Sequence, residues 1–502
     1  MLNDAVITQA YAFLEEQWDT VLNDLRSLVR IDSHEDCSAA APGAPFGPGP
    51  RAALDEAARI MAFYGFELHD CEGYCGYADI PGESEKQLGI IGHLDVVPAG
   101  IGWTYPAFDL TQKDGFLFGR GVTDDKGAFL MAIHALRFWH DRYAREGRAF
   151  PVNVRVIFGC SEETGMADAD YYLAHFDAPD FLFTPDADFP LCYGEKGQYQ
   201  VRVESPLVRD GRIVSFMGGT VVNGVPAQAE ALVWVEGVLP PAAPRITLEV
   251  VEEADAEGAA VQETGTVPSG AAASNVGRKL LCIRAAGIQG HAAMPEGSLN
   301  AIDLLAAYLL ENGLCNKEER SWLEFVRRAT ATTDGEGFGI ACADEDFGPL
   351  TCVGGVATSV EEEPGLRRFT QSIDVRFPVA ISLSALHEQI EQAAASVGAS
   401  VVLLHEVEPL LVSPTSSEIK ALLSAYEDVT GVPAKPFTMG GGTYAHHFPC
   451  AVSFGAIDEG RFPPQPGVGG MHAADEGVIE ESLKQALVIY IVALGRLFAL
   501  DW

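Results

Sequence analysis

A histidine and an aspartate interrupt an apolar run near residue 93. In GHLDVV, residues 92–97, His93 and Asp95 stand two residues apart where the flanking residues predict a buried strand. Residues two apart on a strand point to the same face, so both side chains can reach one partner. An imidazole whose second nitrogen is held by a carboxylate is typical of metal sites. A polar strand end without a ligand explains the same pattern, so the pair alone leaves both interpretations open.

Three pairs of acidic residues stand beside other predicted elements. They are Asp124 and Asp125 before the helical pattern KGAFLMAIHAL, Glu162 and Glu163 after the strand VNVRVIF, and Asp186 and Asp188 after the strand FLF. The helix dipole also explains acids at a helix start. If the three pairs converge, however, they repel one another strongly unless a cation lies between them. The acidic pairs therefore favour a cation site.

A second histidine, His472, lies among glycines in GVGGMHAADEG. Two imidazoles with several carboxylates form the ligand set of zinc, manganese or cobalt. One further carboxylate that is left to act on water completes what metal-assisted hydrolysis needs. The residues therefore predict a metallohydrolase with two metal ions.

Alternating helices and strands must position these residues. From residue 51 to residue 190 the alternation predicts an α/β fold, a mostly parallel sheet with helices on both faces and ligands at the carboxyl ends of its strands. Short runs such as YQVRVES and RITLEVVEE then predict a strand-rich unit, which later includes the helical stretch SLNAIDLLAAYLLENG. We expect an α/β domain in two parts, residues 1–198 and 409–502, with an α+β domain, residues 199–408, inserted between them.

Composition narrows the class of protein. The chain has 502 residues, 48% of them hydrophobic, which suffices for two cores. Its formal charge of -38 disfavours binding to nucleic acid or to anionic membranes. No apolar run reaches the length of a membrane span and the first thirty residues carry acids throughout, so we expect a cytoplasmic protein with reduced cysteines. Cys71 and Cys75 form one CxxxC pair, a weak metal signal by itself.

Eight motifs, in order, resemble those of the M20 metallopeptidases, most closely the PepV-like or Sapep-like dipeptidases of bacteria. They are GHLDVVPAG, GRGVTDDKGA, SEETG, TPDADFP, GHAAMPEGSLNA, DVRFP, GGGTYA and GMHAADE. The resemblance covers essentially the whole chain. It implies a zinc-peptidase-like catalytic domain with two divalent ions, zinc first and manganese or cobalt as alternatives, and an inserted lid domain. It also implies a small peptide as substrate and a monomeric chain.

The resemblance implies roles for the residues at the strand ends. Glu162 would be the general base, Asp95 would hold the imidazole of His93, and the peptide bond between Asp124 and Asp125 would be cis. The implied metal ligands are His93 and Asp186 for one ion, Glu163 and His472 for the other, and Asp124 for both.

The resemblance also implies residues that bind the substrate. His291 would stabilise the oxyanion, with Asn223 in support, and Arg376 would bind the terminal carboxylate. The motif GGGTYA offers backbone amides for the same carboxylate, at Gly441, Gly442 and Thr443. His446 follows this motif where PepV-like proteins usually have arginine, which bears on carboxylate affinity or on the preferred second residue.

These expectations converge on a metal-dependent dipeptidase that removes the N-terminal residue of dipeptides or short peptides by attack of a metal-bound hydroxide. A deacylase of N-acyl amino acids shares the fold and the metal site and is the alternative among hydrolases. A catalytically silent metal-binding protein is the alternative from another class.

Overall fold

The chain divides into two compact units in the computed structural model, which describes residues 2–251 and 278–502. Unit 1 comprises Met1–Gly194, Leu410–Thr438 and Gly442–Trp502. Unit 2 comprises Glu195–Pro409 and Met439–Gly441. The first unit is therefore assembled from segments that are far apart in the sequence.

Unit 1 is built on a mixed sheet whose central strands are parallel. Strand β3 pairs in parallel with β6 and with β7, and β25 pairs in parallel with β7. Strands β1, β2 and β9 extend the sheet with antiparallel pairs. In spatial order the strands are β1 (Leu68–Cys71), β2 (Cys75–Ile80), β6 (Asn153–Gly159), β3 (Gln87–His93), β7 (Phe181–Thr184), β25 (Ala451–Ser453), β9 (Cys192–Glu195) and β23 (Leu410–Leu411).

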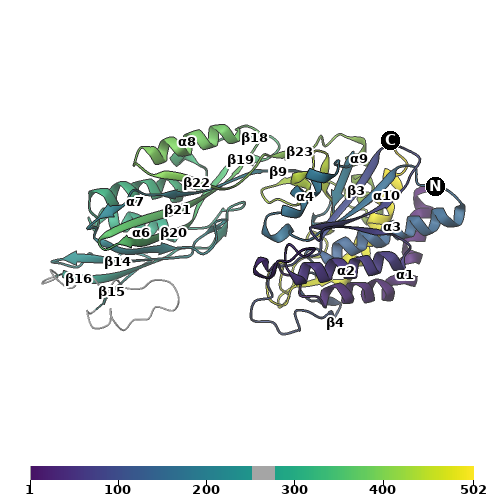
Figure 1. Cartoon of the computed structure of the whole chain (residues 1–502), viewed down its shortest axis with the longest axis horizontal. Helices are drawn as coiled ribbons and strands as arrows, with labels where there is room; N and C mark the ends of the chain where they lie inside the picture. The colour runs from purple at the N-terminus through teal and green to yellow at the C-terminus, as the bar shows by residue number, and fades with distance from the viewer. Residues whose placement is uncertain (1, 252–277) are drawn as a thin grey trace. The chain divides into compact units, whose positions relative to one another are not determined.

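Helices cover both faces of this sheet because neighbouring strand residues point to opposite sides. Ile90 joins the apolar core beneath the long helices, whereas Ile91 joins a smaller cluster on the other face. Figure 1 shows α1, α2 and α3 side by side against the sheet. The helices of the larger core are α1 (Leu2–Val29), α2 (Pro48–Phe63), α3 (Lys126–Glu146), α9 (Ser417–Thr430) and α10 (Glu480–Leu497), and the opposite face holds α4 (Ala167–His175) and the short helix η4 (Tyr444–His447).

Two small strand pairings connect late segments of the chain to early ones within unit 1. Strand β27 (Gly477–Ile479) pairs with β5 (Phe116–Phe118), which also pairs with β4 (Thr111–Lys113). Strand β26 (Ala456–Ile457) pairs with β8 (Ala187–Asp188). The residues around His472 are thus fixed beside those that precede Asp124.

Unit 2 is an antiparallel sheet with helices α6 (Ala301–Glu311), α7 (Lys317–Thr330) and α8 (Leu383–Ala395) packed on its apolar core. Its strands, in spatial order, are β15 (Ile246–Val251), β16 (Arg278–Ala286), β14 (Gln228–Glu236), β12 (Ile213–Gly218), β20 (Thr351–Glu363), β21 (Leu366–Phe377), β10 (Gly197–Glu204) and β22 (Ser400–Val407). The predicted fold class, an α/β sheet with helices on both faces and a second α+β unit, is confirmed.

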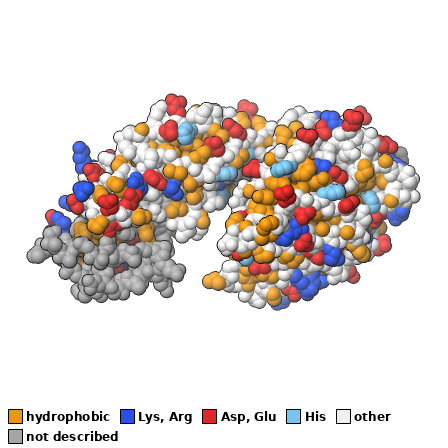
Figure 2. All heavy atoms as spheres, in the orientation of Figure 1, with side chains coloured by type: hydrophobic (Ala, Val, Ile, Leu, Met, Phe, Trp, Pro, Cys, Tyr) orange, Lys and Arg blue, Asp and Glu red, His pale blue; other side chains and the backbone are white. Residues whose placement is uncertain are grey.

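The surface is of mixed charge and the cysteines are unpaired. On the face drawn in Figure 2, basic side chains are scattered among acidic and apolar ones. Within the described parts of the chain, no helix combines the length and the apolarity that crossing a bilayer requires. All ten cysteines are free thiols, and Cys71 and Cys75 face each other across the hairpin of β1 and β2.

Candidate metal centre

The carboxyl edge of the unit 1 sheet collects the acidic and imidazole side chains. His93 is the last residue of β3, Glu162 and Glu163 lie in the helical turn that follows β6, and Asp186 follows β7. Asp124 lies just before α3. Because β3, β6 and β7 are parallel, their carboxyl ends meet at one edge of the sheet. The sheet therefore brings together side chains from four separate motifs.

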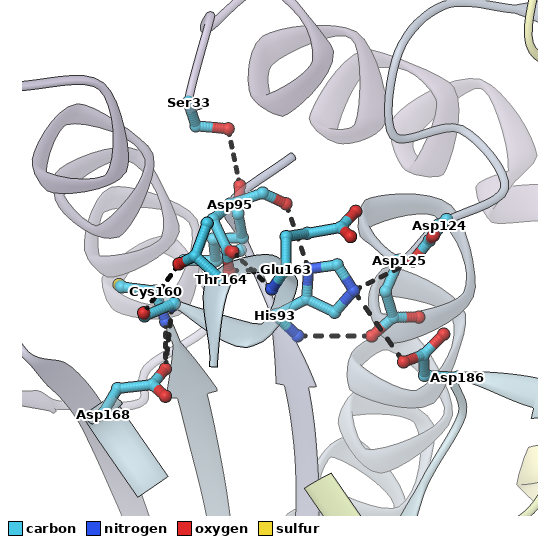
Figure 3. Close-up of polar contacts among 12 residues, drawn as sticks. Ser33, His93, Asp95, Asp124, Asp125, Cys160, Glu163, Thr164, Asp168 and Asp186 are labelled. Atoms are coloured by element: carbon cyan, nitrogen blue, oxygen red, sulfur yellow. Dashed lines mark hydrogen bonds and ion pairs between the residues drawn. The ribbon is translucent and has the colours of Figure 1, made fainter. Parts of the chain in front are cut away.

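Asp124 lies between the two histidines. Its Oδ1 is 3.0 Å from His93 Nε2, and its Oδ2 is 3.0 Å from His472 Nε2. His472 Nε2 is also 3.1 Å from Glu163 Oε2, and His93 Nε2 is 3.8 Å from Asp186 Oδ2. Figure 3 shows the contacts of His93 with Asp124 and Asp186. One carboxylate thus faces an imidazole with each of its oxygens.

Two groups of side chains have ligand atoms close enough to share an ion. One group is His93, Asp124 and Glu163, and the other is His93, Glu162 and Asp186, with the ligand atoms in each group within 4.8 Å of one another. Four carboxylates so close together repel unless a positive charge lies among them. This set of nitrogen and oxygen donors fits divalent zinc, manganese or cobalt.

Burial and neighbouring charges shift the pKa values of the side chains at the site in opposite directions. Burial raises the pKa of Glu162 well above its ordinary value, against the opposing charge of the His93 imidazole. Burial also acts to raise the pKa of Asp124, but hydrogen bonds from His472 and His93 outweigh it and lower that pKa. The contacts with Asp124 and Glu163 raise the pKa of His472 to about 10. The contacts with the two imidazoles therefore stabilise the charged form of Asp124.

Asp95 supports the site through its backbone and its side chain. Its carbonyl oxygen accepts a hydrogen bond from His93 Nδ1 at 3.0 Å, and its Oδ1 lies 3.5 Å from the same nitrogen. Its Oδ2 accepts a hydrogen bond from the Glu163 amide at 3.1 Å. The peptide bond between Asp124 and Asp125 is cis, as the family resemblance implies. Asp95 thus contacts both a candidate ligand on β3 and one after β6.

Asp168 on α4 holds the loop that carries Glu162 and Glu163. Its Oδ2 accepts hydrogen bonds from the amides of Cys160 (2.5 Å) and Ser161 (3.0 Å) and from the hydroxyl of Tyr444. The hydroxyl would lie 1.9 Å from a Cβ at Gly159, so β6 must end on a glycine. Figure 3 shows Asp168 below this loop. Sequence reasoning missed Asp168, although an acid within the helix ADADYYLAH was visible.

Three of the side chains predicted to bind the substrate lie in unit 2. Asn223 Nδ2 and His291 Nε2 are 3.5 Å apart, because the strands beside them, β13 (Gly224–Val225) and β17 (Gly290–His291), pair. Arg376 is buried on β21 and donates from Nε and Nη2 to the two oxygens of Asp374, at 2.7 and 3.1 Å. Burial and then the charge of Arg376 lower the pKa of His291.

The GGGTYA motif crosses from one unit to the other along the chain. Gly441 belongs to unit 2, whereas Gly442 and Thr443 belong to unit 1. Thr443 Oγ1 accepts a hydrogen bond from the Ala445 amide at 3.1 Å, which caps the short helix η4. His446 is half-buried in that helix. The threonine side chain therefore has a local structural role.

The sequence and the fold of this chain are both similar to those of known peptidases. The chain is 29% identical over 484 residues to a Bacillus subtilis (strain 168) protein named "Putative dipeptidase YtjP", with 95% of this chain and 97% of that protein covered. Its fold is similar to that of human carnosine dipeptidase 1 (16% identity, TM-score 0.54) and of the di-peptidase Dug1p from Saccharomyces cerevisiae (14% identity, TM-score 0.57), with 99% of each chain covered in both comparisons. Residues 89–495 match the sequence pattern of peptidase family M20/M25/M40. Since that match spans most of the chain and includes every side chain that faces Asp124, the protein belongs to peptidase family M20/M25/M40.

Proposed function

We propose that this chain is a metal-dependent dipeptidase that hydrolyses dipeptides or short peptides from the N-terminus and uses two divalent ions. The observation that carries the proposal is the placement of Asp124, whose two oxygens each lie 3.0 Å from a different imidazole. A carboxylate in that position suits a bridge between two neighbouring cations. The full-length relative named as a dipeptidase supports the choice of substrate.

The candidate ligands divide between the two proposed ions. We assign His93 and Asp186 to one ion, Glu163 and His472 to the other, and Asp124 to both. Zinc is our first choice, and manganese or cobalt would suit the same donors. When bound, such ions polarise the scissile carbonyl and lower the pKa of a water molecule.

Glu162 is the general base of the proposed reaction. It lies with His93 and Asp186 at the carboxyl edge of the sheet. Burial raises the pKa of its carboxyl group, which suits a group that accepts a proton from water near neutral pH. The same group then donates that proton to the leaving amine. Asp95 positions the Glu163 backbone and the His93 ring while the proton moves.

Unit 2 supplies the proposed lid residues. Asp374 fixes the plane of the Arg376 guanidinium through two hydrogen bonds, and a planar guanidinium suits a terminal carboxylate. We assign oxyanion stabilisation to His291, with Asn223 beside it. From the family resemblance we also assign carboxylate binding to the backbone amides of Gly441, Gly442 and Thr443. We assign residues 199–408 to an inserted lid domain.

A matched substrate panel tests the proposal. Protein loaded in turn with zinc, manganese or cobalt is assayed against dipeptides, tripeptides and the N-acetyl forms of the same C-terminal amino acids. We expect kcat/KM for the best dipeptide to exceed that for its N-acetyl counterpart by at least about 100-fold, because the N-acetyl form lacks the free amino group that distinguishes a dipeptide, and a site that hydrogen-bonds such a group rejects the analogue without it. Turnover of N-acetyl amino acids alone would establish the deacylase instead. Sedimentation and cell fractionation check the expected cytoplasmic monomer.

A further inference from the structure

A buried ion pair joins two loops that carry candidate metal ligands. Arg120 Nη1 donates to Glu476 Oε2 at 2.6 Å, and both side chains are 1% exposed. Arg120 lies in the loop that leads to Asp124, and Glu476 follows His472 by four residues. The partners are 356 positions apart in the chain. The pair therefore connects the segment before helix α3 to the loop that carries His472.

The second oxygen of Glu476 holds the backbone around Asp124. Glu476 Oε1 accepts hydrogen bonds from the amides of Gly121 (3.1 Å), Thr123 (3.0 Å) and Asp124 (3.3 Å). Amides that converge on one carboxylate form a rigid anion-binding turn. Glu476 thereby fixes the residue whose carboxylate lies between the two histidines.

The second terminal nitrogen of the Arg120 guanidinium contacts the backbone of His472. Its Nη2 donates to the carbonyl oxygens of His472 (3.3 Å), Pro98 (3.4 Å) and Ala99 (3.5 Å). The guanidinium carbon also lies 5.2 Å from the centre of the Trp103 ring. One cation therefore contacts the loop after β3 and the loop of the second histidine.

His472 depends on such support more than His93 does. His93 ends a central strand of the sheet and is fully buried. The His472 side chain is 53% exposed, and its backbone has a φ of 64°, a region that residues other than glycine seldom adopt. Asp475 in the same loop accepts hydrogen bonds from the amides of Thr104 and Tyr105, at 2.7 and 3.1 Å. These side-chain contacts thus add to the pairing of β27 with β5 and to the backbone bridge between Gly469 and Glu476, which close the loop behind His472.

We propose that Arg120 and Glu476 are positioning residues that hold His472 in register with Asp124 and so set the affinity of the ion that His472 binds. Neither side chain is one of the proposed metal ligands. The inference rests on the proposed function, because it requires two ions with different ligands. It predicts that damage to the pair acts selectively on one of them.

Titration of demetallated protein with Mn²⁺ alone tests this inference by calorimetry. The variant Glu476→Gln keeps an oxygen for the backbone amides near Asp124 but removes the charge that holds Arg120. We expect the affinity for the ion on His93 and Asp186 to change by less than about threefold, and the ion on Glu163 and His472, the second ion, to bind about 10- to 100-fold more weakly. The control Asp428→Asn breaks the ion pair with Arg496 between α9 and α10 and should leave both affinities unchanged.

The outcomes separate this inference from the proposed function. Two ions in the wild type and unchanged binding in Glu476→Gln would overturn the inference and leave the proposed function standing. Equal weakening of both ions would also overturn it, since the pair would then support the fold in general. A wild type that takes up fewer than two ions would overturn the proposed function first. If Glu476→Gln does not fold, Arg120→Lys replaces it in the same titration. We expect this variant to bind the second ion about 3- to 10-fold more weakly. Unchanged binding of the second ion in Arg120→Lys would overturn the inference.

Discussion

The carboxylate of Asp95 accepts a hydrogen bond from the backbone amide of Glu163 across 3.1 Å. This contact joins the segment after β3 to the loop after β6. We predict that Asp95→Ala weakens Mn²⁺ binding by about 10- to 100-fold, because the backbone of a candidate ligand loses its support. Asp95→Asn keeps one oxygen acceptor and should lie between the wild type and the alanine variant. Equal affinities in all three proteins, measured by calorimetry, would contradict this role.

Substitution of Glu162 separates the proton acceptor from the ligands. We predict that Glu162→Gln lowers kcat on the best dipeptide by about 100-fold or more, because glutamine cannot take a proton from water. Metal content after dialysis should remain at the wild-type level. Glu162 lies in one group with His93 and Asp186, so loss of an ion in this variant would make Glu162 a ligand instead of the base.

Binding of metal ions should release protons. The pKa of His472 is about 10, and that of His93 is also raised, since contacts with Asp124 and Asp95 outweigh the opposing effect of burial. Both shifts favour the protonated imidazole in the metal-free protein, whereas a ligand must be neutral. We predict the release of about two protons at pH 7 and an apparent metal affinity that rises with pH.

Calorimetry in buffers of different ionisation enthalpy counts the released protons. His472→Ala removes one of the two imidazoles, so about one proton fewer should appear for each protein molecule that binds metal. A count near zero in the wild type at pH 7 would show that the imidazoles are already neutral without metal.

Asp168 should make stability depend on pH between about 4 and 6. Burial raises its pKa to about 6 in the folded protein, above about 3.9 in the unfolded chain. Its contribution to stability is therefore present below pH 4 and is lost as the pH rises through 6. Between pH 4 and pH 7, Asp168→Asn should gain about 2 kcal/mol in unfolding free energy relative to the wild type.

Urea denaturation in the presence of a chelator measures this difference at each pH. Asp170→Asn, on the same helix, is the matched control because the Asp170 side chain is 73% exposed. It should show no comparable change with pH. A flat difference for Asp168→Asn would mean that the buried carboxyl group keeps its ordinary pKa.

Much of the candidate site could be predicted from local patterns. His93, Glu163 and Asp186 each end or follow an apolar strand, and parallel strands place such residues at one edge. The fold class followed from the alternation of helices and strands. The direction of the outer strands did not, because a period of two residues is the same in parallel and antiparallel pairs.

The supporting contacts were harder to predict. Arg120 and Glu476 both stand in motifs that the sequence displays, but nothing local indicates that residues 356 positions apart form one buried pair. Asp168 lies in an acidic helix whose exposed and buried acids look alike in sequence. Asp374 and Arg376 were accessible to reasoning, since residues two apart on a strand share a face.

The division of unit 1 between both ends of the chain has a consequence for synthesis on the ribosome. Residues 195–409, the bulk of unit 2, leave the ribosome before β25 and α10 exist. Until then β7 lacks its parallel neighbour β25, and the edge of the nascent sheet stays open to wrong partners. His472 lies between β25 and α10 and also emerges after unit 2, so capture of the second ion can only be one of the last events in maturation.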